Sequence, residues 1–289
     1  GGGPAEQRAR AAEALGVAGQ AQAQTVEALG RALGGGDVAL QRAAASALLR
    51  LAALEPELLA QRALTWALAG AADSRAPTRA VAATILGQGP AVLTAPLLSR
   101  ALSDRDANVR AAAARALGAL GGMKGQDEKT TAAVLAALQR GLGDRDGGVR
   151  VAALRALGGV AAQAPGALGM IKDQLGRGTL LEQAAAAGVL LSRGEGSHRF
   201  VLSQALQSPD VAARRQAVEE ARRDPDAAQR TKILAQGLED SADEVQLLAA
   251  VALAREGDKR GVEQLRRQSG LLLPQRLVAR DALLRLKET

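Results

Sequence analysis

The single histidine and the absence of cysteine limit the chemistry that this chain can carry. Metal sites built from thiolates or from several imidazoles are excluded in a monomer. His198 is the only side chain whose unperturbed pKa lies near neutrality, and Glu195 and Ser197 stand close to it in the sequence. These residues fall in a Gly-rich loop, which is a poor place to hold a base and a nucleophile in fixed geometry. We therefore expect no catalytic residue and predict that the chain is not an enzyme.

Two other short patterns resemble ligand sites. Asp-Arg-Asp occurs at 104–106 and again at 144–146, but it lacks the further oxygen ligands that a calcium loop requires. Gly194 and Gly196 frame a Gly-x-Gly that is too short for a phosphate-binding loop and follows an expected helix rather than a strand. We therefore predict no metal site and no cofactor.

A repeated pattern organises most of the chain. Residues 104–118 and 144–158, offset by 40, both contain Asp-x-x-Val-Arg-x-x-Ala-x-x-Ala-Leu-Gly. The Arg of this pattern serves as a register mark, and nine marks can be aligned: Arg8, Gln41, Arg79, Arg110, Arg150, Gln183, Arg214, Gln246 and Arg276. Ala stands three residues after every mark. Leu stands seven residues after every mark except one, where Ala221 takes its place.

Each mark is expected to lie near the start of a helix, called helix B, because positions three and seven residues later share one helix face. Four residues before the mark, an aspartate is placed to cap the helix in several units: Asp37, Asp106, Asp146 and Asp210. An apolar segment with helical period, called helix A, precedes helix B at 92–102, 131–142, 167–175, 200–206 and 230–238. Glycine often follows helix B, where a left-handed residue would end it, at 16, 87, 118, 158, 194 and 257. The sequence therefore predicts an all-α protein, an α-solenoid of stacked helix pairs.

The motif at 106–118 and 146–158 resembles the HEAT repeat, and the period of most units is similar to that of the short bacterial HEAT repeats also found in phycobilin lyases. The resemblance implies a right-handed superhelix of about nine helix pairs, forming a single domain over 1–289 with residues 1–4 as a flexible leader. It also implies a ladder of hydrogen bonds between adjacent repeats, made by the marked Arg and the Asp four residues earlier. The expected ladder residues are Asp106, Arg110, Asp146 and Arg150. Tetratricopeptide and ankyrin arrays fit less well, because their recurrent aromatic or Thr-Pro-Leu-His positions are missing.

The net charge of +7 raises the question of nucleic-acid binding. The basic excess is spread along the chain, and arginine pairs such as 214–215 and 222–223 lie beside acidic residues. Trp66 and Phe200 are the only aromatic residues, so platforms on which bases could stack are lacking. We therefore do not expect nucleic acid as the main partner. No apolar run reaches the roughly 18 residues of a membrane span.

The favoured hypothesis is a scaffold or adaptor that binds a protein or peptide along the concave face, which helix B lines in such arrays. Arg115 and Arg155, at equivalent positions of neighbouring repeats, are candidate contacts for an acidic partner. Lys124 and Lys129 are further candidates, because they lie in a polar insertion at 121–130 that lengthens one repeat. A nucleic-acid binder and a phycobilin-lyase-like chromophore handler remain as alternatives, although a chromophore clamp usually needs aromatic and histidine contacts.

The compartment and the oligomeric state are not indicated. The chain begins Gly-Gly-Gly-Pro without Met, so we expect a trimmed product whose targeting segment is no longer visible. A cytoplasmic location is the default, and the cell envelope or periplasm is the alternative if a signal was removed.

Overall fold

The computed structural model describes residues 4–18, 23–33, 40, 43–44, 46–48, 50–51 and 76–269. All regular structure in these ranges is helical, which confirms the all-α solenoid class. The chain divides into two compact units, 1–168 and 169–289. The single domain over 1–289 stays a prediction. No helix in the described ranges is long and apolar enough to cross a membrane.

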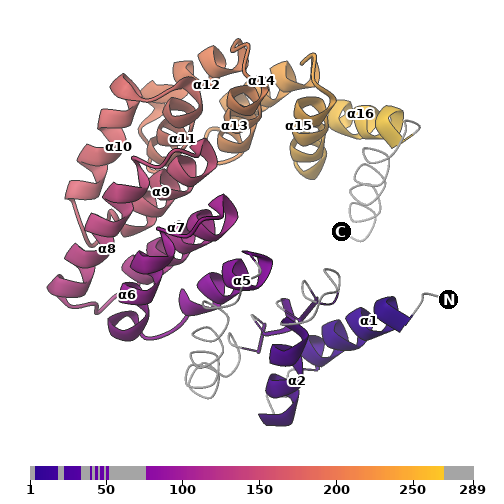
Figure 1. The fold of residues 1–289 in the computed structure, drawn as a ribbon. Coiled ribbons are helices and arrows are strands. Elements are labelled where there is room, and N and C mark those ends of the chain that lie inside the picture. Colours follow the sequence, from indigo (N-terminus) through magenta and orange to yellow (C-terminus); the bar gives the residue numbers. More distant parts are fainter. Residues whose placement is uncertain are drawn as a thin grey trace. The chain divides into compact units, whose positions relative to one another are not determined.

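The first unit places its helices in two rows (Figure 1). Helices α5, α7 and α9 form one row, in which α7 contacts both neighbours. Helices α6 and α8 contact each other and form the second row, with each helix A followed by its helix B. The described helices of this unit are α1 (Pro4–Val17), α2 (Ala23–Leu33), α5 (Ala76–Leu86), α6 (Ala91–Ala101), α7 (Ala107–Gly121), α8 (Glu128–Gly141) and α9 (Gly147–Val160).

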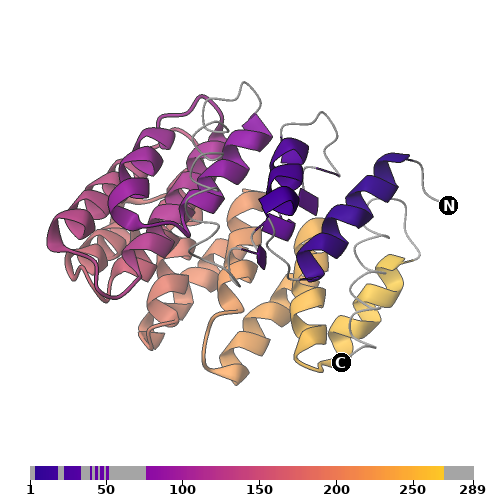
Figure 2. The same cartoon turned by 90° about the horizontal axis from the view of Figure 1, so that it is seen from below.

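The second unit repeats the arrangement (Figure 2). Helix α13 contacts α11 and α15 in the row of B helices, and α12 and α14 contact each other in the row of A helices. Its described helices are α11 (Leu180–Leu191), the short 3-10 helix η1 (Gly196–His198), α12 (Arg199–Leu206), α13 (Val211–Ala221), α14 (Ala227–Leu238), α15 (Asp243–Arg255) and α16 (Lys259–Ser269). Helix α10 (Gly166–Arg177) contains the boundary between the units.

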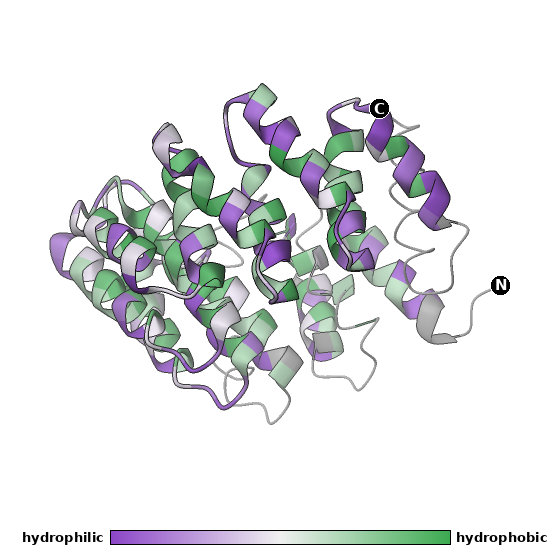
Figure 3. Cartoon of the chain, turned by 90° about the horizontal axis from the view of Figure 1, so that it is seen from above, coloured by the Kyte–Doolittle hydropathy of each residue, from purple (hydrophilic) through white to green (hydrophobic). Residues whose placement is uncertain are grey.

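The repeated Ala and Leu columns form the core of each unit. Ala113, Ala153, Leu117 and Leu157 are completely buried in the first unit, and Figure 3 shows hydrophobic residues where neighbouring helices face each other. Small side chains are needed at the Ala column because helix A approaches closely. A Cβ placed on Gly141 of α8, for example, would lie 3.0 Å from the Cβ of Ala153.

Helix α1 departs from this pattern. Its column residues Ala11 and Leu15 are exposed, whereas Ala12 and Gly16 are buried. In later repeats the column faces the preceding helix A, and no described residue covers that side of α1. Trp66 and the ninth mark, Arg276, lie outside the described residues, as does the predicted leader except for Pro4, which begins α1.

Most of the glycines expected to end helix B have a different role. Only Gly125, Gly194 and Gly257 have positive φ among the described residues, so the prediction of a left-handed residue at Gly87 and Gly118 is wrong. A Cβ on Gly118 would lie 2.6 Å from the Cα of Ala156 in the next helix B, and Gly16 and Gly87 face Ala47 and Ala116 in the same way. These glycines permit adjacent B helices to approach closely.

Candidate partner-binding surface

A ladder of arginine–aspartate pairs links each helix B to the turn before the next one. Arg79 of α5 donates from Nε and Nη2 to the two carboxylate oxygens of Asp104, at 2.7 and 2.8 Å. Arg110 of α7 makes the same bidentate pair with Asp144, also at 2.7 and 2.8 Å. The arginine side chains are both 6% exposed. Such paired and largely buried guanidinium groups are structural contacts, with no donor pair left for a ligand carboxylate.

The remaining guanidinium nitrogen ties each arginine to its own turn. Arg110 donates from Nη1 to the backbone oxygens of Asp104 and Arg105, at 2.9 and 3.3 Å. Arg150 donates from Nη1 to the backbone oxygen of Asp144 at 2.7 Å. One arginine therefore fastens the turn of its own repeat and, through its other nitrogens, the turn of the following repeat.

The ladder carboxylates are not Asp106 and Asp146, as the resemblance implied, but Asp104 and Asp144. Asp106 accepts from the amide of Asn108 at 2.8 Å and Asp146 from the amide of Val149 at 3.2 Å, so both cap their own helices. An N-cap side chain folds back onto the first turn of its helix and points away from the preceding repeat. The signal was present in the sequence as the repeated Asp-x-Asp, whose first member we considered only as a cation ligand.

The ladder shifts the pKa values of its members. Hydrogen bonds from Arg79 and Arg110 hold the pKa of Asp104 and of Asp144 below the usual value, although partial burial opposes the shift. The same pair raises the pKa of Arg110. These carboxylates stay ionised at neutral pH and do not act as acids or bases there.

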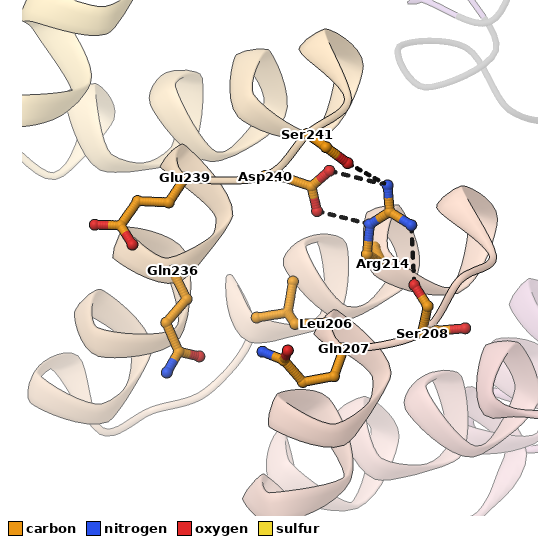
Figure 4. A pocket seen from close by; sticks show the side chains of 8 residues that line it. All are labelled: Leu206, Gln207, Ser208, Arg214, Gln236, Glu239, Asp240 and Ser241. Atoms are coloured by element: carbon orange, nitrogen blue, oxygen red, sulfur yellow. Dashed lines mark hydrogen bonds and ion pairs between the residues drawn. The ribbon is translucent and has the colours of Figure 1, made fainter.

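The second unit contains the same ladder beside a surface hollow of about 490 Å³. Arg214 donates to both oxygens of Asp240, at 2.8 and 3.1 Å, and to Ser241 (Figure 4). Its Nη1 donates to the backbone oxygens of Ser208 and Pro209, at 2.9 and 3.2 Å. The only cation lining this hollow is thus committed to the ladder, and we do not assign the hollow as a ligand site.

Gln replaces Arg at two described marks and keeps only part of this network. Gln246 donates to the backbone oxygen of Asp240 at 2.6 Å, and its own side-chain oxygen accepts from Gln264 at 2.8 Å. Gln183 donates to the backbone oxygen of Gly178 at 2.8 Å. The bond within the turn is therefore retained without a charged pair.

The loop around His198 does not form a catalytic group. Glu195 pairs with Lys172 at 3.1 Å and lies 3.5 Å from Nε2 of His198, and the hydrogen bond from Lys172 lowers the pKa of Glu195. No hydrogen bond joins the side chains of His198 and Ser197. Within the described ranges, no group of three or more His, Asp or Glu residues is placed to hold a metal ion.

Arg115 and Arg155 lie on helices that are in close contact. Gly118 and Ala156 bring α7 and α9 together. Arg115 is exposed, and Arg155, one repeat further on, is half-buried. Partial desolvation and, second, the charge of Arg155 lower the pKa of Arg115. No described residue forms a hydrogen bond or ion pair with Arg115, so its charge is raised in energy without a compensating carboxylate.

The surface around this pair is built from small residues. On the same exposed stripe of α7 lie Asn108 and Ala119, and on that of α9 lie Gly148 and Gly159. The backbone is therefore accessible beside the two guanidinium groups, in the manner of a shallow extended surface rather than an enclosed pocket. We call Arg115, Arg155 and these four small residues the inner face.

Lys124 and Lys129 are not part of the inner face. Four of the ten residues of the insertion at 121–130 belong to the end of α7 and the start of α8, and the other six form a turn, 122–127. Asp127 caps α8 by accepting from the amide of Thr130 at 2.8 Å. Both lysines are exposed, Lys124 in the turn and Lys129 in the first turn of α8.

Comparison with solved structures finds the same fold in unrelated settings. The chain has 20% identity and a TM-score of 0.50 to human deoxyhypusine hydroxylase in complex with glycerol, covering 92% of this chain and 97% of that one. The Escherichia coli protein YibA has 17% sequence identity and a TM-score of 0.50, and the match covers 100% of this chain and 98% of that one. A homology model of the full-length AP-3 complex in an intermediate open conformation has 13% sequence identity and a TM-score of 0.56. The match covers 96% of this chain and 54% of that one. At these identities the likeness concerns the fold alone.

This likeness corrects one prediction. The chain was predicted not to be an enzyme because its helical repeats lack a catalytic constellation. That prediction is wrong, since the fold is shared with an enzyme, deoxyhypusine hydroxylase. A helical-repeat array therefore does not exclude catalysis.

Comparison of the sequence with curated proteins and with models of protein families tests the resemblance to HEAT repeats. No curated protein sequence matches the chain. The model of HEAT repeats matches residues 62–158, a segment that includes the motif at 106–118 and 146–158 on which the resemblance was based. The resemblance is thereby confirmed: the chain contains HEAT repeats.

Proposed function

We propose that this protein is a scaffold or adaptor that binds an acidic segment of a partner protein across the inner face. The observation that carries the proposal is Arg115, an exposed cation with a lowered pKa and no hydrogen-bond or ion-pair partner among the described residues. A carboxylate placed beside it would relieve both the desolvation of the guanidinium and the repulsion from Arg155. An extended acidic peptide suits this surface, because the small residues leave room for a backbone.

The contrast with the ladder supports this assignment. Arg79, Arg110 and Arg214 occupy equivalent positions and each satisfies a carboxylate of the neighbouring turn. Arg115 lies five residues after its mark, on the part of α7 that faces solvent rather than the next turn. The fold therefore uses one set of arginines internally and leaves Arg115 accessible to a partner.

The test uses a fluorescein-labelled peptide of ten glutamates and fluorescence anisotropy. We expect the wild-type chain to bind the peptide, and Arg115→Glu and Arg155→Glu each to weaken binding by about tenfold, because an attraction is replaced by a repulsion. Arg31→Glu is the matched control, since Arg31 is exposed at the end of α2 and forms no hydrogen bond or ion pair with a described residue. Equal weakening by all three variants would show only a general effect of net charge and would refute the proposal.

Nucleic acid is tested in the same assay with a labelled DNA duplex. Neutralising about six phosphates costs on the order of a thousandfold in affinity between 50 and 200 mM salt. We expect weak duplex binding that disappears over this range. Tight duplex binding at 200 mM salt would instead favour nucleic acid as the partner.

A further inference from the structure

Apolar residues occupy part of the solvent-facing side of α6 and α8. Val92 and Leu93 of α6 are 66% and 56% exposed, and Pro96 one turn later is also exposed. In α8 the exposed residues at helical spacing are Ala132, Ala133 and Ala136. We call these six residues the outer strip. Neighbouring exposed apolar side chains are more informative than isolated ones, because a contiguous patch is usually a contact surface.

The two halves of the outer strip are equivalent positions of adjacent repeats. The marks Arg110 and Arg150 are 40 residues apart, and the same offset relates Val92, Leu93 and Pro96 to Ala132, Ala133 and Ala136. Helices α6 and α8 are in contact with each other, and Figure 1 shows them side by side. The apolar residues of the two helices therefore continue one surface across two repeats.

Cations stand at one end of the outer strip, and exposed charges of both signs stand at the other. Arg100 and Arg140, also related by the offset of 40, are exposed in the last turns of α6 and α8. Lys124 and Lys129 lie at the other end, where α8 begins, together with the exposed carboxylates of Asp127 and Glu128. No described residue forms a hydrogen bond or ion pair with the side chain of any of these four cations. An arginine in a last turn also stabilises its helix through the macrodipole, but this effect does not account for the exposed apolar residues of the strip.

The other A helices do not repeat this combination. In α14 the residues equivalent to Leu93, Pro96 and Arg100 are Gln229, Lys232 and Gln236, and all three are exposed. In α10 the position of Arg100 is occupied by the exposed Asp173. In α12 the position of Pro96 is occupied by Phe200, which is 65% exposed, and that of Arg100 by the exposed Gln204, so this helix has an exposed apolar side chain without the cation.

We propose that the outer strip binds an amphipathic helix of a partner protein whose apolar stripe is flanked by acidic residues. The alanines of α8 form a low, smooth surface on which another helix can pack closely, as helix A and helix B already do within each repeat. Charge complementarity fixes the sign of the flanking residues at one end of the strip, where Arg100 and Arg140 stand in the last turns of α6 and α8.

Two other occupants fit less well. A second copy of the chain, paired through a two-fold contact, would offer Arg100 and Arg140 an end of the strip at which Lys124 and Lys129 offset Asp127 and Glu128, so it would bring no net acidic charge. A lipid surface is bound best by helices with bulky aromatic or leucine side chains, and three of the six strip residues are alanine. Both alternatives become outcomes of the test.

The experiment exploits the absence of cysteine from the chain. A single cysteine, Gln139→Cys, placed at the exposed edge of the strip, carries an environment-sensitive fluorophore. The probe is an 18-residue helical peptide with a leucine stripe and glutamates at its ends, and the comparison peptide has lysines in place of the glutamates. We expect saturable binding of the acidic peptide and at least tenfold weaker binding of the basic one.

Variants then locate the contact. Leu93→Asp with Ala136→Asp should weaken the acidic peptide at least tenfold, and Arg100→Glu with Arg140→Glu should do so about tenfold while improving the basic peptide. Lys232→Glu, an exposed charge reversal on α14, should change the affinity less than twofold. Circular dichroism melts establish that each variant is folded, since all substituted residues are exposed.

The proposal is overturned if the acidic peptide does not bind, or if its binding survives the paired Asp substitutions. A fluorophore response to anionic vesicles that exceeds the response to the peptide would favour a lipid surface instead. Concentration-dependent dimerisation that occludes the fluorophore would favour a second copy of the chain. The location of the fluorophore on α8 separates this surface from the inner face, so failure here leaves the proposed function to its own test.

Discussion

The ladder leads to a quantitative prediction that compares two aspartates of one turn. Asp144 pairs with Arg110 of the preceding repeat and also accepts from the amide of Asp146 at 2.8 Å. Asp146 caps only its own helix. We compare Asp144→Ala with Asp146→Ala, because the same atoms are removed from positions two residues apart.

The magnitudes follow from what each change leaves behind. Asp144→Ala leaves the guanidinium of Arg110, which is 6% exposed, without its carboxylate partner. Removing one partner of a buried ion pair lowers the free energy of unfolding by about 3–5 kcal/mol. Asp144 itself is 11% exposed, so a value near the lower end, about 3 kcal/mol, is expected. Asp146→Ala removes an N-cap, which costs about 1 kcal/mol.

The assay is urea unfolding followed by circular dichroism at 222 nm, with the wild type and both variants measured together. The double variant Arg110→Met with Asp144→Leu completes the comparison, and it should recover much of the loss, because well-packed apolar residues can replace a buried pair. Equal destabilisation by the two alanine variants, or a larger effect of Asp146→Ala, would refute the assignment of Asp144 to the ladder.

Three further predictions rest on the same packing and charges. Ala153→Leu should lower the free energy of unfolding by about 1–3 kcal/mol, because it overpacks the Ala column. Ala119→Leu on the exposed stripe of α7 should change the free energy of unfolding by less than about 0.5 kcal/mol. Equal melting temperatures of the two variants would contradict the register. Gly118→Ala should destabilise the protein, because the added Cβ meets Ala156. Gly176→Ala should stabilise it by about 0.5–1 kcal/mol, because the added Cβ has no atom within 4 Å and alanine favours the helix. Thermal unfolding of the two variants tests this difference. The pKa of Asp144 is lowered in the folded state, so its stabilisation is present above the unfolded pKa of about 3.9 and is lost as pH falls through the folded pKa. The difference in urea midpoint between the wild type and Asp144→Asn should therefore be constant at neutral pH and shrink below about pH 4, and a difference that grows on acidification would contradict the pairing.

The helices and the core columns could be predicted from sequence because they depend on local periodicity. The Ala and Leu columns recur at three and seven residues after each mark, and Ala113, Ala153, Leu117 and Leu157 are buried as such spacing requires. The mismatch at α1 has a tertiary reason. Leu15 obeys the same spacing, but burial needs a helix on its other side, and the described residues provide none.

The glycines and the ladder show why longer-range contacts were missed. Gly118 follows helix B in sequence as a terminating residue would, yet its role is set by Ala156, 38 residues later. The partner of Arg110 lies 34 residues away, and that of Arg79 lies 25 away. The repeat period shows that such neighbours exist, but the choice between Asp104 and Asp106 depends on which carboxylate points toward the preceding repeat.

The sequence by itself determined the all-α repeat fold, its register and the exclusion of thiolate and multi-histidine sites within one chain, since these follow from residue types and local spacing. Only the tertiary structure decided which charges remain for a partner. Stacking brings the turn carboxylates to Arg79, Arg110 and Arg214, and it leaves Arg115 on the inner face and Arg100 and Arg140 beside an apolar outer strip. The physical reason is that a guanidinium is neutralised by whatever lies within hydrogen-bond distance of it, and in a solenoid that neighbour belongs to another repeat.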